Sequence, residues 1–287
     1  MSVHARHLVL LSVLIAGVAF AQGVTRTRVT YPAPTTDLMI PATLLMPAAS
    51  GAVPAVVIAH GSGGVDGRGD YHAEALNRAG IATLEIDMWG PRGLKGGPQG
   101  RPRRLSETYP DVYGALQWLA SRADVDPQRI GIMGFSWGGA LAVATASARL
   151  TEQFTGGKDK FAAHVGFYPT CWSFLPRLPR AAEFKMTGAP VKILVGDKDD
   201  YDSPDACQRL LDALPAESRA LVALTVYPGG YHGWDGNARA NFFDPNAALG
   251  KGGQVRFFPD GKLAERSRRE NAEFFSRAFG VTPTAKP

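Results

Sequence analysis

The chain has 287 residues, of which 45% are hydrophobic and 20% are charged, and its formal net charge at pH 7 is +5. This composition fits one globular domain with a sizeable core and excludes a disordered or low-complexity chain. The positive charge is spread along the sequence, and no nucleic-acid-binding motif accompanies it, so we expect no nucleic-acid partner.

The chain opens with a short basic segment and an apolar run. Arg6 precedes the apolar residues 8–20, and Ala19-Phe20-Ala21 has the A-x-A pattern of a cleavage site. The run is too short to span a bilayer comfortably, so a retained membrane anchor is the weaker interpretation. We therefore predict a signal peptide over residues 1–21 and an exported protein, periplasmic or secreted. The mature domain would cover residues 22–287 and have no stable membrane anchor.

The first predicted strands form a hairpin followed by buried parallel strands. Residues 24–30 and 38–46 have strand composition and are separated by prolines, which suits an antiparallel hairpin. Residues 54–59 are continuously apolar, as in a parallel strand covered on both faces. A helix that ends near Gly80 leads to the next strand, 81–86.

Strands and helices then alternate to the end of the chain. Strands are predicted at 129–133, 161–168, 191–195 and 221–227, and helices near 109–119, 139–150, 203–214 and 263–279. This alternation predicts an α/β fold with a mostly parallel sheet and helices on both faces. Active sites of such folds lie beyond the carboxyl ends of the strands.

The loop over residues 88–104 is rich in glycine, proline and basic side chains. Its cationic cluster consists of Arg92, Lys95, Arg101, Arg103 and Arg104. We take it first as a solvated loop and second as a region that attracts an anionic substrate. Arg92 either binds a substrate carboxylate or forms a salt bridge with Asp87.

The sequence Gly134-Phe135-Ser136-Trp137-Gly138 lies between a predicted strand and a predicted helix. A serine in a Gly-x-Ser-x-Gly turn at such a junction is a nucleophile elbow. The tight turn strains the serine backbone and requires glycines on both sides, because a side chain there would collide with the neighbouring chain. A chance glycine-rich turn is the alternative, but the flanking strand and helix favour the elbow.

A serine hydroxyl needs a base to remove its proton and an acid to orient that base. In elbow enzymes these follow in the order serine, acid, histidine. His232 is the candidate base, since it lies in a glycine-rich loop after the last predicted strand. The other histidines precede the serine, leave with the signal peptide or lie inside a strand: His4, His7, His60, His72 and His164.

The candidate acid lies in the turn that follows the strand over 191–195. Asp199 is our choice, with Asp200 as the second and Asp197 as the third. The alternative interpretation is a solvated acidic turn. The predicted triad is therefore Ser136, Asp199 and His232.

Two backbone amides are expected to form an oxyanion hole. One belongs to Trp137, and the other comes from the glycine-rich loop after His60, with Ser62 as first choice and Gly61 as second. The loop has no Gly-Lys-Ser/Thr sequence for a nucleotide phosphate, and the chain has no zinc-ligand spacing. We expect no metal and no cofactor.

The chain contains two cysteines, Cys171 and Cys207. In an exported protein an even cysteine count favours a disulfide, although two buried thiols are the alternative. The bridge would close a loop of 36 positions. The chain-entropy treatment gives such a bridge roughly 3 to 4 kcal/mol of stabilisation.

Together these motifs resemble the α/β-hydrolase superfamily, and more narrowly the dienelactone hydrolase family, over about residues 40–280. The resemblance rests on His60-Gly-Ser-Gly-Gly, Asp87-Met-Trp-Gly-Pro-Arg92, the elbow, Leu194-Val-Gly-Asp-Lys-Asp199 and Tyr227-Pro-Gly-Gly-Tyr-His232. It implies a sheet of about eight strands and cleavage of an ester or lactone through an acyl-enzyme. Exported members carry similarly placed cysteines, which supports the bridge. The namesake enzymes use a cysteine nucleophile, so Ser136 favours a general carboxylesterase over a dienelactone hydrolase.

The sequence therefore predicts a serine esterase whose partner is a small-molecule ester or lactone. Trp89, Gly61 and Arg92 are the candidate substrate-binding residues. Because the base must be neutral, kcat/KM should fall below about pH 6 to 7, where histidine titrates. A peptidase or a perhydrolase would share the triad, and a non-catalytic envelope-binding protein would typically have lost one member of it.

Overall fold

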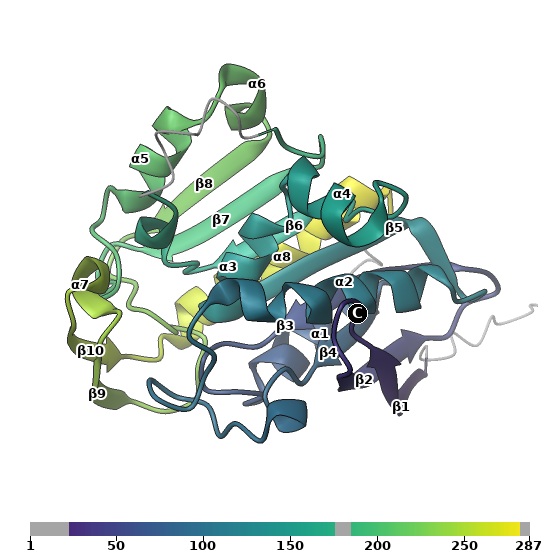
Figure 1. Cartoon of the computed structure of the whole chain (residues 1–287), viewed down its shortest axis with the longest axis horizontal. Helices are drawn as coiled ribbons and strands as arrows, with labels where there is room; N and C mark the ends of the chain where they lie inside the picture. Colours follow the sequence, from purple (N-terminus) through teal and green to yellow (C-terminus); the bar gives the residue numbers. More distant parts are fainter. Residues whose placement is uncertain (1–22, 176–184, 282–287) are drawn as a thin grey trace, which may run out of the picture.

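The computed structural model describes residues 23–175 and 185–281, so the predicted signal peptide lies outside the described residues. One eight-stranded sheet runs through the molecule in the order β1-β2-β4-β3-β5-β6-β7-β8 (Figure 1). Its strands are β1 (Val24–Pro32), β2 (Met39–Pro47), β3 (Val53–Ala59), β4 (Ala82–Ile86), β5 (Val125–Phe135), β6 (His164–Phe167), β7 (Val191–Gly196) and β8 (Val222–Tyr227). The predicted hairpin is present: β1 pairs antiparallel with β2, and β2 pairs antiparallel with β4. The other pairs are parallel.

Helices cover both faces of this sheet. They are α1 (Arg68–Arg78), α2 (Tyr109–Ala120), α3 (Trp137–Ala144), α4 (Ala148–Thr155), α5 (Ala206–Ala213), α6 (Ala216–Arg219) and α8 (Gly261–Phe279). The short α7 (Ala247–Gly250) contacts residues 253–257, which lie outside this sheet. Short 3₁₀ turns lie at Gly90–Arg92 and Leu105–Thr108. The predicted α/β fold with a mostly parallel sheet is confirmed.

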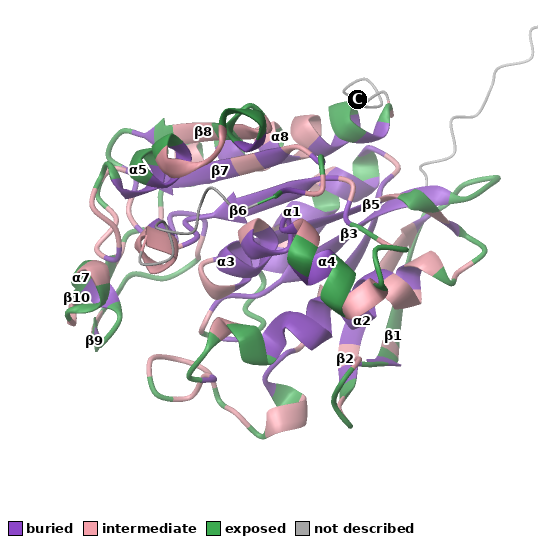
Figure 2. Cartoon of the chain, turned by 45° about the horizontal axis from the view of Figure 1, so that its top comes forward, coloured by how far each residue is buried: buried purple, intermediate pink, exposed green. Residues whose placement is uncertain are grey.

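The central strand β3 shows why the sheet is buried on both sides. All seven of its residues are buried (Figure 2). Val57 packs in a cluster with Leu116 of α2 and Leu141 of α3. Its neighbour Ile58 packs in a second cluster with residues of α1 and α8. Alternate side chains of an apolar strand therefore point into two separate cores, as the pleat requires.

Three elements differ from the sequence prediction. The predicted helix over 139–150 is two helices, because the chain leaves α3 at Thr145 and begins α4 after Ser147. The strand predicted at 161–168 is limited to β6. A small antiparallel hairpin, β9 (Ala240–Asp244) and β10 (Gly253–Phe257), was not predicted at all.

The last helix, α8, has clear signals at both ends. The Asp260 carboxylate accepts hydrogen bonds from the amides of Lys262 and Leu263, both at 3.0 Å. At the other end Gly280 adopts the left-handed conformation with φ of 64°. These are the usual N-cap and C-terminal glycine of a stable helix. Within the described part of the chain, neither this helix nor any other is long and apolar enough to cross a bilayer.

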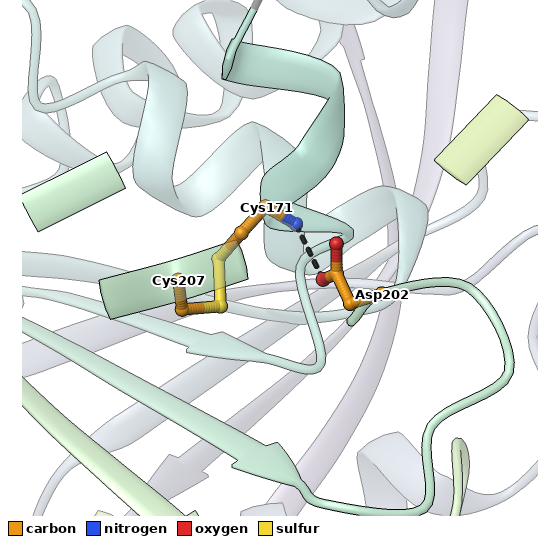
Figure 3. Close-up of side chains that lie close together, drawn as sticks. All are labelled: Cys171, Asp202 and Cys207. Carbon is orange, nitrogen blue, oxygen red and sulfur yellow. Dashed lines mark hydrogen bonds between the residues drawn. A yellow bond between two sulfur atoms is a disulfide. The ribbon is translucent and has the colours of Figure 1, made fainter. Parts of the chain in front are cut away.

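The predicted disulfide is present and joins the segment after β6 to α5. Cys171 and Cys207 are 36 positions apart, and both are buried. The Asp202 carboxylate accepts a hydrogen bond from the Cys171 amide at 2.7 Å (Figure 3). It accepts another from the Trp172 amide, also at 2.7 Å. Burial raises the pKa of Asp202 to about 7, and the nearby Asp199 charge adds to this. The segment that begins at Thr170 is therefore fixed both covalently and by a carboxylate.

Candidate active site

The serine elbow lies at the junction between β5 and α3. Ser136 has φ of 51° and ψ of −106°, a conformation that strains any residue with a side chain. Its amide donates to the Phe167 carbonyl at 2.9 Å, and the Gly138 amide donates to the His60 carbonyl at 3.1 Å. A Cβ on Gly138 would lie 2.5 Å from the carbonyl carbon of Ala59, so only glycine fits there. The Trp137 amide is the first of α3, and early helix amides have no intrahelical partner.

His232 and Asp199 are hydrogen-bonded beyond the ends of β8 and β7. His232 Nδ1 lies 2.7 Å from Asp199 Oδ2, and the two side chains are 1% and 3% exposed. A carboxylate accepts, so Nδ1 carries the proton and Nε2 presents a lone pair. Nε2 is buried and has no hydrogen-bond partner among the described residues. The histidine is thus held in the tautomer that can accept a proton at Nε2.

The alternative carboxylates are engaged elsewhere. Asp200 forms a salt bridge with Arg256 of β10, with a shortest distance of 2.8 Å. Asp197 accepts the Gly229 amide at 2.7 Å. Of the three aspartates in this turn, Asp199 is the one that reaches the histidine.

Aromatic rings enclose the imidazole of His232. Tyr201 and Tyr168 lie with their ring centroids 4.4 and 4.6 Å from it, and Phe257 lies 5.7 Å away. Tyr201 also lines the cavity into which Ser136 opens. Tyr201 therefore contacts the imidazole and also lines the cavity of Ser136, whereas His232 and Asp199 are not among the described residues that line it.

That cavity has a volume of about 310 Å³. Its lining includes Ser62, Ser136, Trp137, Trp172, Arg101 and Tyr201. Arg103 and Arg104 line it as well. This volume suits a small molecule.

The loop after His60 reaches the same cavity through Ser62. The Trp89 indole donates to the Ser62 carbonyl at 3.0 Å, and Arg101 donates to the Ser62 hydroxyl at 3.0 Å. Arg101 is itself held by a bidentate pair with Asp244 at 2.8 and 2.9 Å. Ser62 and Trp137, the two predicted oxyanion donors, thus border one cavity with Ser136.

Of the residues predicted to bind substrate, Gly61 and Trp89 lie close to the elbow, and Arg92 is held by a carboxylate. Arg92 forms a salt bridge with Asp111, at 2.8 and 3.0 Å. The salt bridge that we predicted between Arg92 and Asp87 is therefore wrong. Asp87 instead accepts the amides of Trp89 and Gly90. Within the described part of the chain, Arg92, Trp89 and Gly61 do not line the cavity. The arginines that do, Arg101, Arg103 and Arg104, come from the same cationic loop.

His60 has a supporting position and is neutral. Its Nδ1 lies 2.8 Å from the Gly61 carbonyl, and its Nε2 accepts the Met88 amide at 3.0 Å. Burial lowers the pKa of His60 from 6.5 to about 4. The ring therefore links the loop before Ser62 to the end of β4.

This buried histidine should make folding sensitive to acid. Between pH 6.5 and 4, His60 is protonated in the unfolded chain but stays neutral in the folded protein. The free energy of unfolding therefore falls as the pH drops through this window. We expect the stability advantage of wild type over His60→Gln to shrink by up to about 3 kcal/mol from pH 7 to 4. Urea unfolding of both proteins at each pH measures it. An advantage that does not change with pH would contradict this.

Among the described residues, one group of potential metal ligands has its ligand atoms close together. It consists of Cys171, Asp202 and Cys207 (Figure 3). The two sulfurs are bonded to each other, so they are not available as thiolate ligands.

The sequence matches the profile of the dienelactone hydrolase family over residues 40–258. The chain belongs to this family. An uncharacterized protein of Mycobacterium tuberculosis (strain CDC 1551 / Oshkosh) is 32% identical over 178 residues, which make up 60% of this chain and 62% of that protein. The match to this relative therefore spans less than two thirds of its length.

Several solved structures have the same fold as this member of the dienelactone hydrolase family. The crystal structure of a putative dienelactone hydrolase from Klebsiella pneumoniae subsp. pneumoniae has a TM-score of 0.64 and 18% identity, covering 89% of this chain and 99% of the other. Thermogutta terrifontis esterase 2, phosphorylated by paraoxon, has a TM-score of 0.65 and 16% identity, with coverages of 90% and 96%. These likenesses confirm the α/β-hydrolase fold.

Proposed function

We propose that the protein is a serine hydrolase that cleaves small carboxylic esters or lactones through an acyl-enzyme. The observation that carries the proposal is the buried Asp199–His232 pair, whose imidazole has an unpartnered Nε2 and contacts Tyr201, a residue that lines the cavity of the strained Ser136. A nucleophile, a base and an acid that orients the base are the three groups that acyl transfer requires.

In the proposed first step, Ser136 Oγ attacks the carbonyl carbon of the ester and transfers its proton to His232 Nε2. The carbonyl oxygen becomes an oxyanion that accepts hydrogen bonds from the Trp137 and Ser62 amides. Collapse of this intermediate breaks the bond to the alkoxy oxygen. The leaving alcohol takes the proton from His232, and the acyl group remains on Ser136.

In the second step a water molecule attacks the acyl-enzyme, and His232 takes its proton. Collapse releases the carboxylic acid and returns the proton to Ser136. Asp199 stabilises the imidazolium in both halves of the cycle without itself being protonated. No step calls for a metal or a cofactor.

We also propose that the protein is exported and acts in the periplasm or outside the cell. The apolar amino-terminal run and the Cys171–Cys207 bridge support this, since disulfides persist in oxidising compartments.

A fluorophosphonate probe tests the assignment of the nucleophile, because phosphonylation requires a serine activated by a base. We expect a single adduct on the peptide that contains Ser136, found by mass spectrometry of the digested protein. Ser173→Ala removes another serine from the same cavity and should still be labelled. An unlabelled wild-type protein, or an adduct on a different serine, would refute the proposal.

A further inference from the structure

Asp235 lies three residues after the candidate base, and its side chain is completely buried. Its Oδ1 accepts the Tyr168 hydroxyl at 2.5 Å, and its Oδ2 lies 3.0 Å from His72 Nε2. The exposure of the His72 and Asp235 side chains is 0%. A carboxylate only accepts, so His72 donates from Nε2. The Asp235 carboxylate therefore anchors the loop that carries His232 to His72 and Tyr168.

Tyr168 connects this carboxylate to the base itself. Its ring lies 4.6 Å from the His232 ring, while its hydroxyl donates to Asp235 and accepts from Arg68 Nη1 at 3.0 Å. Tyr168 has φ of 39°, a left-handed conformation that a tyrosine adopts only where its surroundings enforce it.

The other end of the same group reaches the nucleophile elbow. The Arg68 guanidinium lies 5.3 Å from the centre of the Phe135 ring, and the His72 ring lies 5.2 Å from it. Phe135 is the residue before Ser136. Arg68, His72, Tyr168 and Asp235, which we call the buried polar network, thus contact the elbow on one side and the base loop on the other.

The charges of the network compensate one another. Burial opposes ionisation of Asp235, but the hydrogen bond from His72 and the charge of Arg68 outweigh it and lower the pKa of Asp235. Arg68 also pairs with Asp66. A buried charged network of this kind is weak support for stability, since well-packed apolar residues would serve as well. A hydrogen-bonded buried network of this kind instead holds its side chains in one arrangement.

We propose that the buried polar network sets the separation and orientation of Ser136 and His232, and that Tyr168 and Asp235 are positioning residues for the base. The inference rests on the proposed function. Within the described part of the chain, no member of the network lines the cavity.

Tyr168→Phe tests this directly, because it keeps the ring against His232 and deletes only the hydroxyl. We expect kcat/KM for a short p-nitrophenyl ester to fall by about 10- to 100-fold, as for other small displacements of catalytic groups. Tyr31→Phe is the matched control. It also deletes a buried tyrosine hydroxyl, which makes one hydrogen bond, at 3.0 Å to the Asp111 carbonyl, where the Tyr168 hydroxyl makes two. Tyr31 lies far from the site in sequence and on the edge strand β1. It should retain wild-type kcat/KM.

Asp235→Asn tests the inference through the pH dependence of kcat/KM, which a general loss of stability would not change. The titratable or charged groups around His232 are Asp199, Tyr168, Tyr201 and, one contact further out, Asp235, Arg68, Asp244 and Arg101. Removing the negative charge of Asp235 disfavours the imidazolium. The acid limb of kcat/KM should therefore move to lower pH.

The outcomes separate the inference from the proposed function. If Ser136→Ala abolishes turnover while Tyr168→Phe keeps wild-type kcat/KM, the network is merely structural and the inference fails. The same conclusion follows if Tyr31→Phe loses as much activity as Tyr168→Phe, or if the acid limb of Asp235→Asn stays at its wild-type pH. If Ser136→Ala itself remains active, the proposed function fails instead.

Discussion

Replacing Ser136 by alanine should reduce turnover of a short p-nitrophenyl ester by about 10⁴- to 10⁶-fold, because the covalent route is lost and only binding and oxyanion stabilisation remain. The measurement is kcat for the purified variant at pH 8, compared with wild type at equal concentration of folded protein. A variant that keeps more than a tenth of the wild-type kcat would remove Ser136 from the mechanism.

Ser136→Gly is the informative companion variant. It lacks the hydroxyl and should be as inactive as Ser136→Ala. Glycine adopts the φ of 51° without a steric penalty, however, so it relaxes the strain of the elbow. Ser136→Gly should therefore be more stable than Ser136→Ala by about 1 kcal/mol in urea unfolding. Equal stabilities would mean that this turn stores no strain.

The second large effect is expected for Gly138→Ala. The added Cβ would lie 2.5 Å from the Ala59 carbonyl carbon and 2.8 Å from the His60 carbonyl oxygen, and both are backbone atoms at the end of the central strand β3. Neither the strand nor α3 can retreat, since each is packed on the core. We expect a loss of at least about 4 kcal/mol of stability, or no soluble protein, together with loss of activity.

Gly51→Ala is the matched control for this substitution. A Cβ at Gly51 meets no atom within 4 Å, so the same chemical change should leave stability within about 0.5 kcal/mol of wild type. Soluble yield and the midpoint of urea unfolding measure both variants. If Gly138→Ala unfolds at the wild-type midpoint, the close approach of α3 to β3 is not what requires glycine.

The parts of the site that were predictable from sequence are those encoded locally. The elbow is a contiguous pattern with a strand before it and a helix after it, so Ser136 could be placed on its residues alone. His232 followed from the order of the elements, because the loop after the last parallel strand lies at the same edge of the sheet. These placements needed no knowledge of distant contacts.

The choice among the three aspartates depended on tertiary contacts. Asp200 is drawn away by Arg256 of β10, a strand that was not predicted. The alternating side chains of Gln254-Val255-Arg256-Phe257 were a signal for that strand. Its glycine- and proline-rich surroundings concealed it.

The contacts of Arg92 and of the buried polar network could not be predicted from the sequence. Asp87 is five residues from Arg92, yet the guanidinium pairs with Asp111 on α2, because that helix begins beside the 3₁₀ turn that carries Arg92. Tyr168 and Arg68 are 100 positions apart. No spacing in the sequence relates such residues, and their pairing follows only from the packing of α1 beside the end of β6.

The strand order has a consequence for how the protein is made. β5, β6, β7 and β8 are neighbours in space in the same order as in the sequence. Ser136 directly follows the first of them, and His232 follows the last. A nascent chain therefore exposes its hydroxyl long before the imidazole has been synthesised. Under the proposed mechanism, a growing polypeptide, or one truncated ahead of β8, would be chemically inert, and hydrolysis would begin only when the final parallel strand had docked.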